Sequence, residues 1–203
     1  MVMHIISSIS LRNRLLFLVL LISCFSKSQT YTYFIYSEKK EQVGDLKITR
    51  TIKDTITRID MVSQIKIKLL ITTSVKCDLT TVYHNNELYS NSVVTYRNNS
   101  VSSVAKTLKM GSYYQFVKDG AKTTYPDKIV YSESMLYFQE PAKLSSLYSE
   151  FDGVAKSVVE KEASYYQVKN PINGNVSEYL YKNNILSVAT IHFQMMILHL
   201  VKQ

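Results

Sequence analysis

The stretch Ile65–Thr80, "IKIKLLITTSVKCDLT", decides the fold class. Seven of its eight odd-numbered residues are apolar, against one of the eight even-numbered residues. Such alternation predicts a β-strand with one buried face and one face in water, with Cys77 on the buried face. A straight strand of this length would run roughly 50 Å, well beyond an ordinary strand. We therefore expect a bend or bulge, most simply at Thr72–Ser74, or a strongly coiled sheet or barrel.

The rest of the chain repeats this pattern of strand-like runs separated by short turn signals. Asn-Asn, Asp-Gly and Asn-Gly pairs tolerate the positive φ angles of tight hairpin turns, and Asp119-Gly120 is a strong hairpin signal. We predict an all-β, antiparallel meander that forms a barrel-like or strongly coiled sheet, as one domain over residues 29–203. The expected strands are 31–38, 44–52, 55–63, 65–83, 88–96, 102–109, 113–118, 121–125, 155–159, 164–169, 177–181 and 185–201.

Two segments depart from simple alternation. Ser132–Pro141, "SESMLYFQEP", groups four apolar residues and ends in proline, which predicts a short helix capped by Ser132 or Ser134 and covering one mouth of the barrel. A strand there is the alternative. Ile185–Val201, "ILSVATIHFQMMILHLV", is nearly apolar on both faces, which predicts a central strand that is buried on both sides or whose outer face contacts a helix or another protein.

The first residues have the features of a secretory signal peptide. Arg12 and Arg14 precede the apolar segment Leu15–Phe25, whose helical length of about 16 Å is too short for the hydrocarbon core of a bilayer. Small residues follow it, so we expect a helical signal peptide over residues 1–28 and cleavage after Ser28. The product would be exported, to the periplasm or outside the cell, and would not be an integral membrane protein.

Two alternatives remain for this segment. One is an uncleaved signal anchor. The other is bacterial lipoprotein processing, because Leu21–Cys24, "LISC", is similar to a lipobox; Cys24 would then be acylated and would anchor the protein to the outer membrane.

Charge and motifs exclude several classes of function. The formal charge of +8 falls to about +5 without residues 1–28, and the lysines are scattered, so we expect no nucleic-acid binding. The chain has no P-loop, nucleophile elbow or zinc motif, so we expect no cofactor, no metal and no enzymatic activity. His192 and His199 would lie on opposite faces of one regular strand. Glu133 and Glu140 could pair as acid and base, but solvated charges at a helix end explain them better.

The segments Asp127–Pro141, "DKIVYSESMLYFQEP", and Glu178–Gln203 carry a resemblance to a known family. The chain resembles an uncharacterised family, a domain of unknown function, of small exported β-rich proteins from Gram-negative bacteria. The resemblance implies a secreted or cell-envelope β-protein. Its motifs are turns and aromatic residues, so it implies no active site.

The abundant tyrosines suggest one kind of site. Tyr114, Tyr137, Phe138 and Tyr166 could line a cavity for an apolar or ring-shaped ligand, although cross-strand aromatic packing would also explain them. We therefore expect an exported cell-envelope protein that holds an apolar small molecule or lipid in a barrel-like interior. The alternative is a structural or interaction protein of the envelope that uses its apolar C-terminal strand.

Overall fold

The computed structural model describes residues 26–68, 72–193 and 196–203. Leu15–Phe25 and Cys24, on which the expected leader helix and the lipobox depend, lie outside these residues. The described chain forms one antiparallel sheet of fourteen strands and one short 3₁₀ helix. The elements are β1 (Lys27–Ser37), β2 (Gln42–Lys53), β3 (Ile56–Lys68), β4 (Thr72–His84), β5 (Glu87–Arg97), β6 (Ser100–Met110), β7 (Tyr113–Lys118), β8 (Ala121–Tyr125), η1 (Glu133–Tyr137), β9 (Ser146–Tyr148), β10 (Ala155–Glu162), β11 (Tyr165–Lys169), β12 (Val176–Lys182), β13 (Ile185–Phe193) and β14 (Met196–Lys202).

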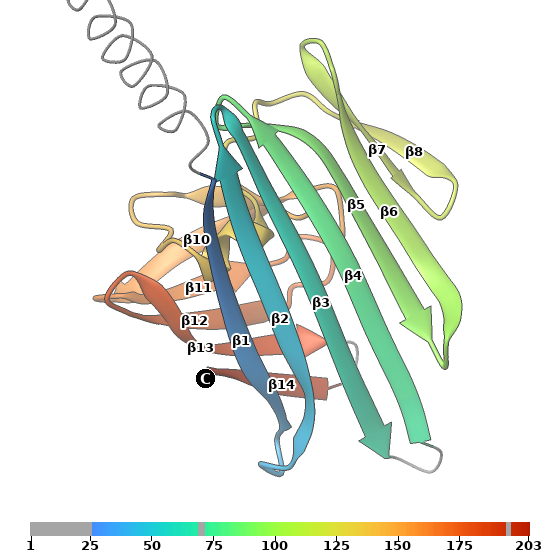
Figure 1. Ribbon diagram of the computed structural model, residues 1–203, viewed down its shortest axis with the longest axis vertical. Helices are drawn as coiled ribbons and strands as arrows, with labels where there is room; N and C mark the ends of the chain where they lie inside the picture. The colour runs from blue at the N-terminus through green and yellow to red at the C-terminus, as the bar shows by residue number, and fades with distance from the viewer. Residues whose placement is uncertain (1–25, 69–71, 194–195) are drawn as a thin grey trace, which may run out of the picture.

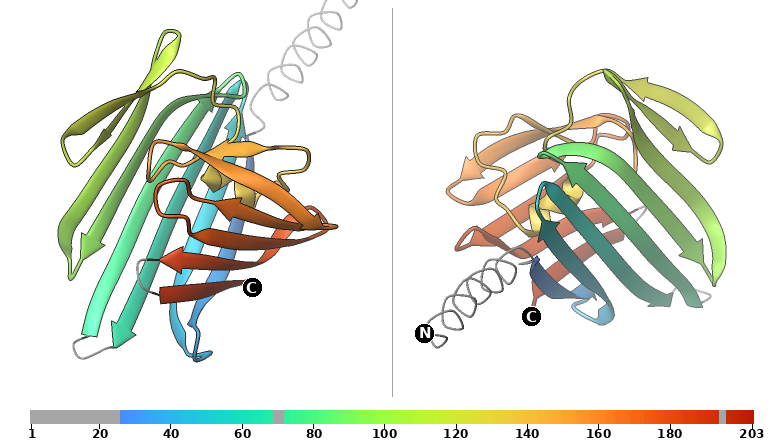
Figure 2. Two further views of the ribbon diagram at one scale, coloured as in Figure 1. Left: turned by 180° about the vertical axis from the view of Figure 1, so that it is seen from behind. Right: turned by 45° about the horizontal axis from the view of Figure 1, so that its top comes forward.

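The sheet consists of two meanders joined at the ends of the chain. Strands β1–β8 follow one another in order, strands β9–β14 do the same, and β1 pairs with β14. Because β8 and β9 are the two edges, the sheet is not closed, and its strong coiling places β10–β14 behind and across the long strands β1–β3 (Figures 1 and 2). The predicted all-β, barrel-like meander is confirmed.

Strand β1 begins within the predicted signal peptide. Lys27 and Ser28 pair with Ile52 and Thr51 of β2, and both residues are exposed. Cleavage after Ser28 would therefore shorten an exposed strand end and leave the core intact.

The long alternating stretch is a hairpin rather than one bent strand. Strand β3 ends at Lys68, β4 begins at Thr72, and these two residues pair with each other. The reversal thus precedes the predicted bend at Thr72–Ser74. Odd-numbered residues pair with odd-numbered residues, as in Ile65 with Val75, so the alternation runs through the hairpin without a break.

The C-terminal apolar segment is also a hairpin, of β13 and β14. Thr190 pairs with His199 and His192 pairs with Ile197. Cross-strand partners share a face, and residues two apart on a strand share a face, so His192 and His199 lie on the same side of the sheet. The prediction of one strand with these histidines on opposite faces is wrong, because the chain reverses between them.

The link between β8 and β9, residues 126–145, lies between the two layers of the sheet (Figure 2). Its carbonyl oxygens of Ile129 and Tyr131 accept hydrogen bonds from the amides of Leu88 (2.9 Å) and Tyr148 (3.1 Å). The predicted short helix is present in this link as η1, in which Leu136 is fully buried. The Ser132 side chain makes no capping bond. It hydrogen-bonds instead to the Tyr83 hydroxyl group (2.6 Å) and to Glu150.

Tyrosine fills much of the space between the layers. Nine tyrosines belong to the buried core. Seven of their hydroxyl groups form hydrogen bonds within the protein, as when Tyr33 donates to the carbonyl oxygen of Leu186 (3.1 Å) and Tyr181 to that of Leu136 (2.9 Å). A buried tyrosine keeps such a partner because an unpaired hydroxyl group away from water is costly.

Candidate functional site

A cavity of about 660 Å³ lies between the two layers. Alternation along each strand turns one set of side chains toward it, for example Val75, Cys77 and Leu79 of β4. The walls are mostly apolar. Their apolar residues are Ile35, Leu46, Met61, Ile65, Val75, Cys77, Leu79, Val93, Ala105, Tyr137, Phe151, Val168, Tyr179, Ile191, Leu198 and Leu200.

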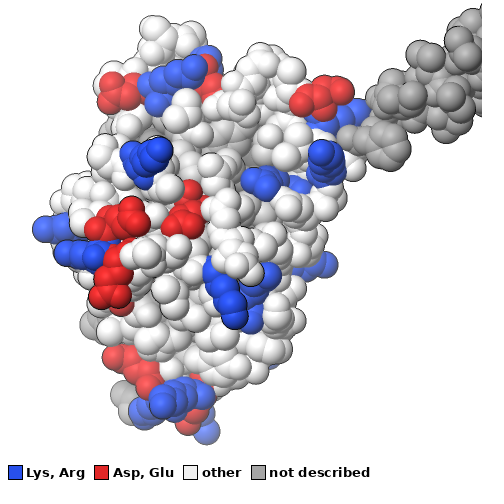
Figure 3. Space-filling model, turned by 90° about the vertical axis from the view of Figure 1, so that its left-hand side faces the viewer, with Lys and Arg blue, Asp and Glu red and all other residues white. Residues whose placement is uncertain are grey.

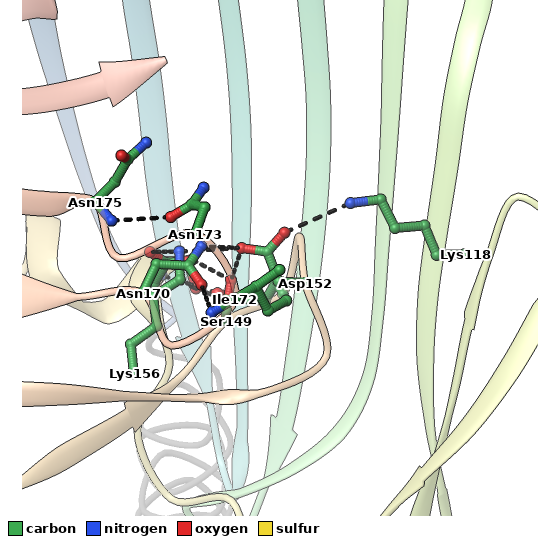
Figure 4. Close-up of polar contacts among 11 residues, drawn as sticks. Lys118, Ser149, Asp152, Lys156, Asn170, Ile172, Asn173 and Asn175 are labelled. Atoms are coloured by element: carbon green, nitrogen blue, oxygen red, sulfur yellow. Dashed lines mark hydrogen bonds and ion pairs between the residues drawn. The ribbon is translucent and has the colours of Figure 1, made fainter. Parts of the chain in front are cut away.

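A polar cluster borders this cavity near η1 and the start of β10. Lys156 Nζ lies 2.8 Å from Glu133 Oε1 and 3.2 Å from Asp152 Oδ2. Ser149 Oγ donates to Glu133 Oε2 at 2.6 Å, and Asn170 Nδ2 donates to Asp152 Oδ2 at 3.0 Å (Figure 4). Residues from three separate segments of the chain, 133, 149–156 and 170, therefore hold one another in place at this wall.

The ionisation of this cluster follows from its contacts. Burial on its own would lower the pKa of Lys156, but Glu133 and Asp152 outweigh it and raise that pKa. Burial on its own would raise the pKa of Asp152, but Lys156, Lys118 and Ser149 outweigh it and lower that pKa. Lys156 and Asp152 therefore stay charged at neutral pH.

Lys118 reaches this cluster from the opposite layer. It extends from the end of β7 toward Asp152, and its Nζ lies 3.5 Å from Asp152 Oδ1 (Figure 4). Its side chain is 42% exposed, whereas that of Lys156 is 12% exposed. The Lys118–Asp152 contact thus spans the two layers at the solvent-accessible side of the cavity.

The loop between β9 and β10 positions Asp152. The amide of Gly153 donates to the Ser149 carbonyl oxygen and that of Ser149 to the Val154 carbonyl oxygen, both at 2.9 Å. Gly153 has a φ of 69°, and a Cβ at this position would lie 2.3 Å from the ring of Phe116. Only glycine fits both constraints, so it allows the loop to pack against β7.

A buried carboxyl group lies behind the cavity wall. Glu150 is fully buried, and it accepts hydrogen bonds from Thr81 Oγ1 (3.2 Å), the Ser134 amide (3.3 Å) and the Ser132 hydroxyl group. Burial raises its pKa more than these donors lower it. Ser134 lines the cavity, so this network supports the wall from behind.

The structure separates the four aromatic residues that the sequence suggested as a ligand site. Tyr137 lines the cavity. Tyr114 is buried and donates to Glu87 (3.0 Å), and Tyr166 is buried and donates to Glu140 (2.8 Å). Phe138 packs on Tyr31, with ring centroids 5.4 Å apart, and beneath the guanidinium group of Arg50. Tyr114, Phe138 and Tyr166 are not among the residues that line the cavity.

Sequence reasoning found part of the wall and missed the polar cluster. Alternation placed Cys77 on the correct face. No motif links Glu133 to Asp152 and Lys156, because Glu133 lies in η1 and the other two residues lie around the start of β10. Within residues 26–68, 72–193 and 196–203, no group of three or more His, Cys, Asp or Glu residues could hold a metal ion. No helix in the same residues is long and apolar enough to cross a membrane.

Residues 33–201 match the family model of a domain of unknown function, DUF6134. The chain belongs to the DUF6134 family. This match confirms the expectation, drawn from the sequence, that the chain belongs to an uncharacterised family. No curated protein matches this DUF6134 chain.

The fold of this DUF6134 protein is similar to that of a solved structure. It is the crystal structure of a β-barrel-like protein of domain of unknown function DUF1849 from Brucella abortus. The two chains superpose with a TM-score of 0.56 at 10% sequence identity, over 88% of this chain and 95% of the other. At this identity the likeness extends to the fold alone.

Proposed function

We propose that this DUF6134 protein is an exported cell-envelope protein that binds an apolar small molecule or lipid in the cavity between its two layers. The cavity itself carries the proposal. Its volume of about 660 Å³ lies within the range of about 300–1,000 Å³ that is usual for small-molecule sites, and apolar side chains from both layers make up 16 of its 31 lining residues. The role is binding rather than catalysis.

The alternative, an envelope interaction protein that uses its C-terminal strand, has less support. Ile191, Leu198 and Leu200 line the cavity. They therefore do not form an outward patch for a partner. Val201 is the main exposed apolar side chain on β14, at 38% exposure.

Binding of the neutral dye Nile red tests the ligand proposal. Its fluorescence should rise when it enters the apolar cavity. Ala105→Phe places a ring in the cavity and should weaken binding at least tenfold, whereas Lys106→Phe, on the exposed face of the same strand, should not. Thr95→Phe, at a half-buried position of the wall, is the second variant if Ala105→Phe does not fold.

Two results would refute the ligand proposal. Folded Ala105→Phe or Thr95→Phe protein that binds the dye as tightly as the wild type would show that this cavity is not the site. Absence of dye binding by the wild type would refute the ligand proposal as well.

Export is proposed from the first 28 residues. Expression of the full chain in a Gram-negative host, followed by mass measurement of the exported product, tests it. A chain that starts at Gln29 without lipid supports signal-peptide cleavage. A diacylglyceryl-modified chain that starts at Cys24 would establish the lipoprotein alternative, and a full-length cytoplasmic chain would refute export.

On the face shown in Figure 3, basic and acidic side chains are scattered among uncharged residues. Across its described residues, this face has no extended basic stripe. The proposal accordingly includes a small molecule and no nucleic acid.

A further inference from the structure

Half of the exposed large apolar side chains gather at one end of the sheet. That end, uppermost in Figure 1, holds the start of β1 and the turns β2–β3, β4–β5 and β6–β7. Six of the twelve large hydrophobic residues that are exposed in the described chain lie there: Ile56, Tyr89, Leu108, Met110, Tyr113 and Val130. Single exposed apolar residues are ordinary, but a group of them usually marks a contact with a protein or a membrane.

Three of these side chains form one patch on the β6–β7 hairpin. Met110 pairs with Tyr113, and Leu108 lies two residues before Met110 on the same face of β6. Leu108, Met110 and Tyr113 are 44%, 41% and 40% exposed, whereas their chain neighbours Thr107 and Tyr114 are buried. This hairpin patch, Leu108, Met110 and Tyr113, therefore lies on the outer face of the sheet, away from the space between the layers.

Two lysines continue the same outer face. Lys106 of β6 and Lys122 of β8 both pair with Val117 of β7, and both lysines are exposed. Lys106 lies two residues before Leu108, so the lysines share a face with the hairpin patch. Within the part of the chain that the structure describes, neither lysine forms an ion pair. Exposed apolar side chains, a tyrosine and ammonium groups on one face fit the surface of an anionic bilayer.

The course of the chain brings this end of the sheet close to a membrane. Strand β1 begins at Lys27 at the same end, directly after the apolar segment Leu15–Phe25, which we expect to enter a membrane during export. From Cys24 to Lys27 the chain spans at most about 11 Å. Until the leader is cleaved, or permanently if Cys24 is acylated, the start of β1 therefore stays beside the bilayer.

We propose that the hairpin patch, with Lys106 and Lys122 beside it, docks this end of the sheet on an anionic lipid bilayer. The apolar side chains enter the head-group region, and the two lysines contact lipid phosphates. The exposed wall residues Arg97 and Ser102 lie near the β5–β6 turn, at the opposite end of β6, and stay in water. Docking thus uses a surface separate from the cavity and does not depend on ligand binding.

A fluorophore at either end of β6 tests the proposal. Ser112→Cys, in the β6–β7 turn, and Ser100→Cys, at the start of β6, are labelled with the environment-sensitive dye NBD on the exported protein, in which Cys77 is buried. Vesicles of phosphatidylethanolamine and phosphatidylglycerol should shift the NBD emission of Ser112→Cys to the blue and leave that of Ser100→Cys unchanged. Sodium chloride at about 0.5 M should weaken the response about threefold or more, because it screens exposed charges.

Substitutions in the hairpin patch identify the side chains responsible. With vesicles at the concentration that gives half of the full response, Met110→Ser/Tyr113→Ser should lower the response of Ser112→Cys about fivefold or more, because the inserted apolar area is lost. Val101→Ser is the matched control, because Val101 is an exposed apolar residue at the other end of β6. Thermal unfolding checks each variant, and Leu108→Ser replaces the double variant if that does not fold.

Three results would overturn the proposal. The first is an absent NBD response, or an equal one at the two ends of β6. The second is an unchanged response in folded Met110→Ser/Tyr113→Ser or Leu108→Ser protein. The third is a blue shift of Ser112→Cys that needs no vesicles and grows with protein concentration, which would assign the hairpin patch to a second copy of the chain.

Discussion

The ammonium group of Lys156 lies 2.8 Å from the Glu133 carboxylate, and both side chains are less than one-fifth exposed. This ion pair joins β10 to η1, two elements that belong to different segments of the chain. Together with Asp152 it forms the polar border of the cavity. Its contribution to the free energy of unfolding can be measured by substituting Lys156.

Lys156→Met should destabilise the protein by about 2–3 kcal/mol. The substitution removes the ammonium group that neutralises the nearly buried carboxylates of Glu133 and Asp152. Urea unfolding at neutral pH measures the change. Lys161→Met, at an exposed position of the same strand, should stay within about 0.5 kcal/mol of the wild type. Equal stability of the two variants would show that the Lys156 ion pairs contribute nothing net.

Glu150 should make stability fall as the pH rises. Burial raises its pKa in the folded protein above the ordinary 4.5, so the folded state binds more protons than the unfolded state. This contribution is fully present below pH 4.5 and is lost as the pH rises through the folded-state pKa. Glu150→Gln should therefore gain stability relative to the wild type between pH 5 and 8.

The pH experiment needs a matched control, because other carboxyl groups titrate in the same range. Glu38→Gln, at an exposed turn, should keep a constant stability difference from the wild type over the same pH range. A constant difference for Glu150→Gln as well would contradict the raised pKa of Glu150.

Cys77 should be almost inert toward alkylation in the folded protein. Burial raises its pKa to about 12 from 9.0, so roughly a thousandfold less thiolate is present at neutral pH than for an ordinary thiol. In a Cys24→Ser background, iodoacetamide should modify Cys77 only after the protein unfolds. Rapid modification of folded protein would mean that the thiol is not buried as described.

Fatty acids of increasing length should bind with increasing affinity until the cavity is full. Each added methylene group contributes up to about 0.8 kcal/mol, which is roughly fourfold in Kd. Titration of a saturated series against Nile red should show a plateau. Ala105→Phe should reach the plateau at a shorter chain, and an unchanged plateau would place the chain elsewhere.

Local sequence signals predicted the hairpins with distinctive turns. The expected strands 113–118 and 121–125 match β7 and β8 residue for residue. The turn between them, Asp119-Gly120, has φ angles of 50° and 89°, which only a few residue types adopt readily. Strand β9, with three residues, was missed because it is too short for alternation to register.

Alternation could not reveal the reversal between β3 and β4. When odd-numbered residues pair with odd-numbered residues, as Ser63 does with Cys77, both strands turn the same parity toward the core. One long strand and a hairpin then have the same pattern of apolar and polar residues. The reversal within segment 185–201 was missed for a related reason, because both faces of the segment are largely apolar and it contains no Gly, Pro, Asn or Asp to indicate a turn.

The sequence by itself determined the fold class and which face of each strand is buried, because side-chain direction along a strand depends on the residue's place in a two-residue repeat. Only the tertiary structure decided where the two meanders join, how Lys156 meets Glu133 and Asp152 meets Lys118, and that a cavity remains between the layers. Those features arise from the coiling of the whole sheet and from contacts between residues distant in the chain, to which no local pattern refers.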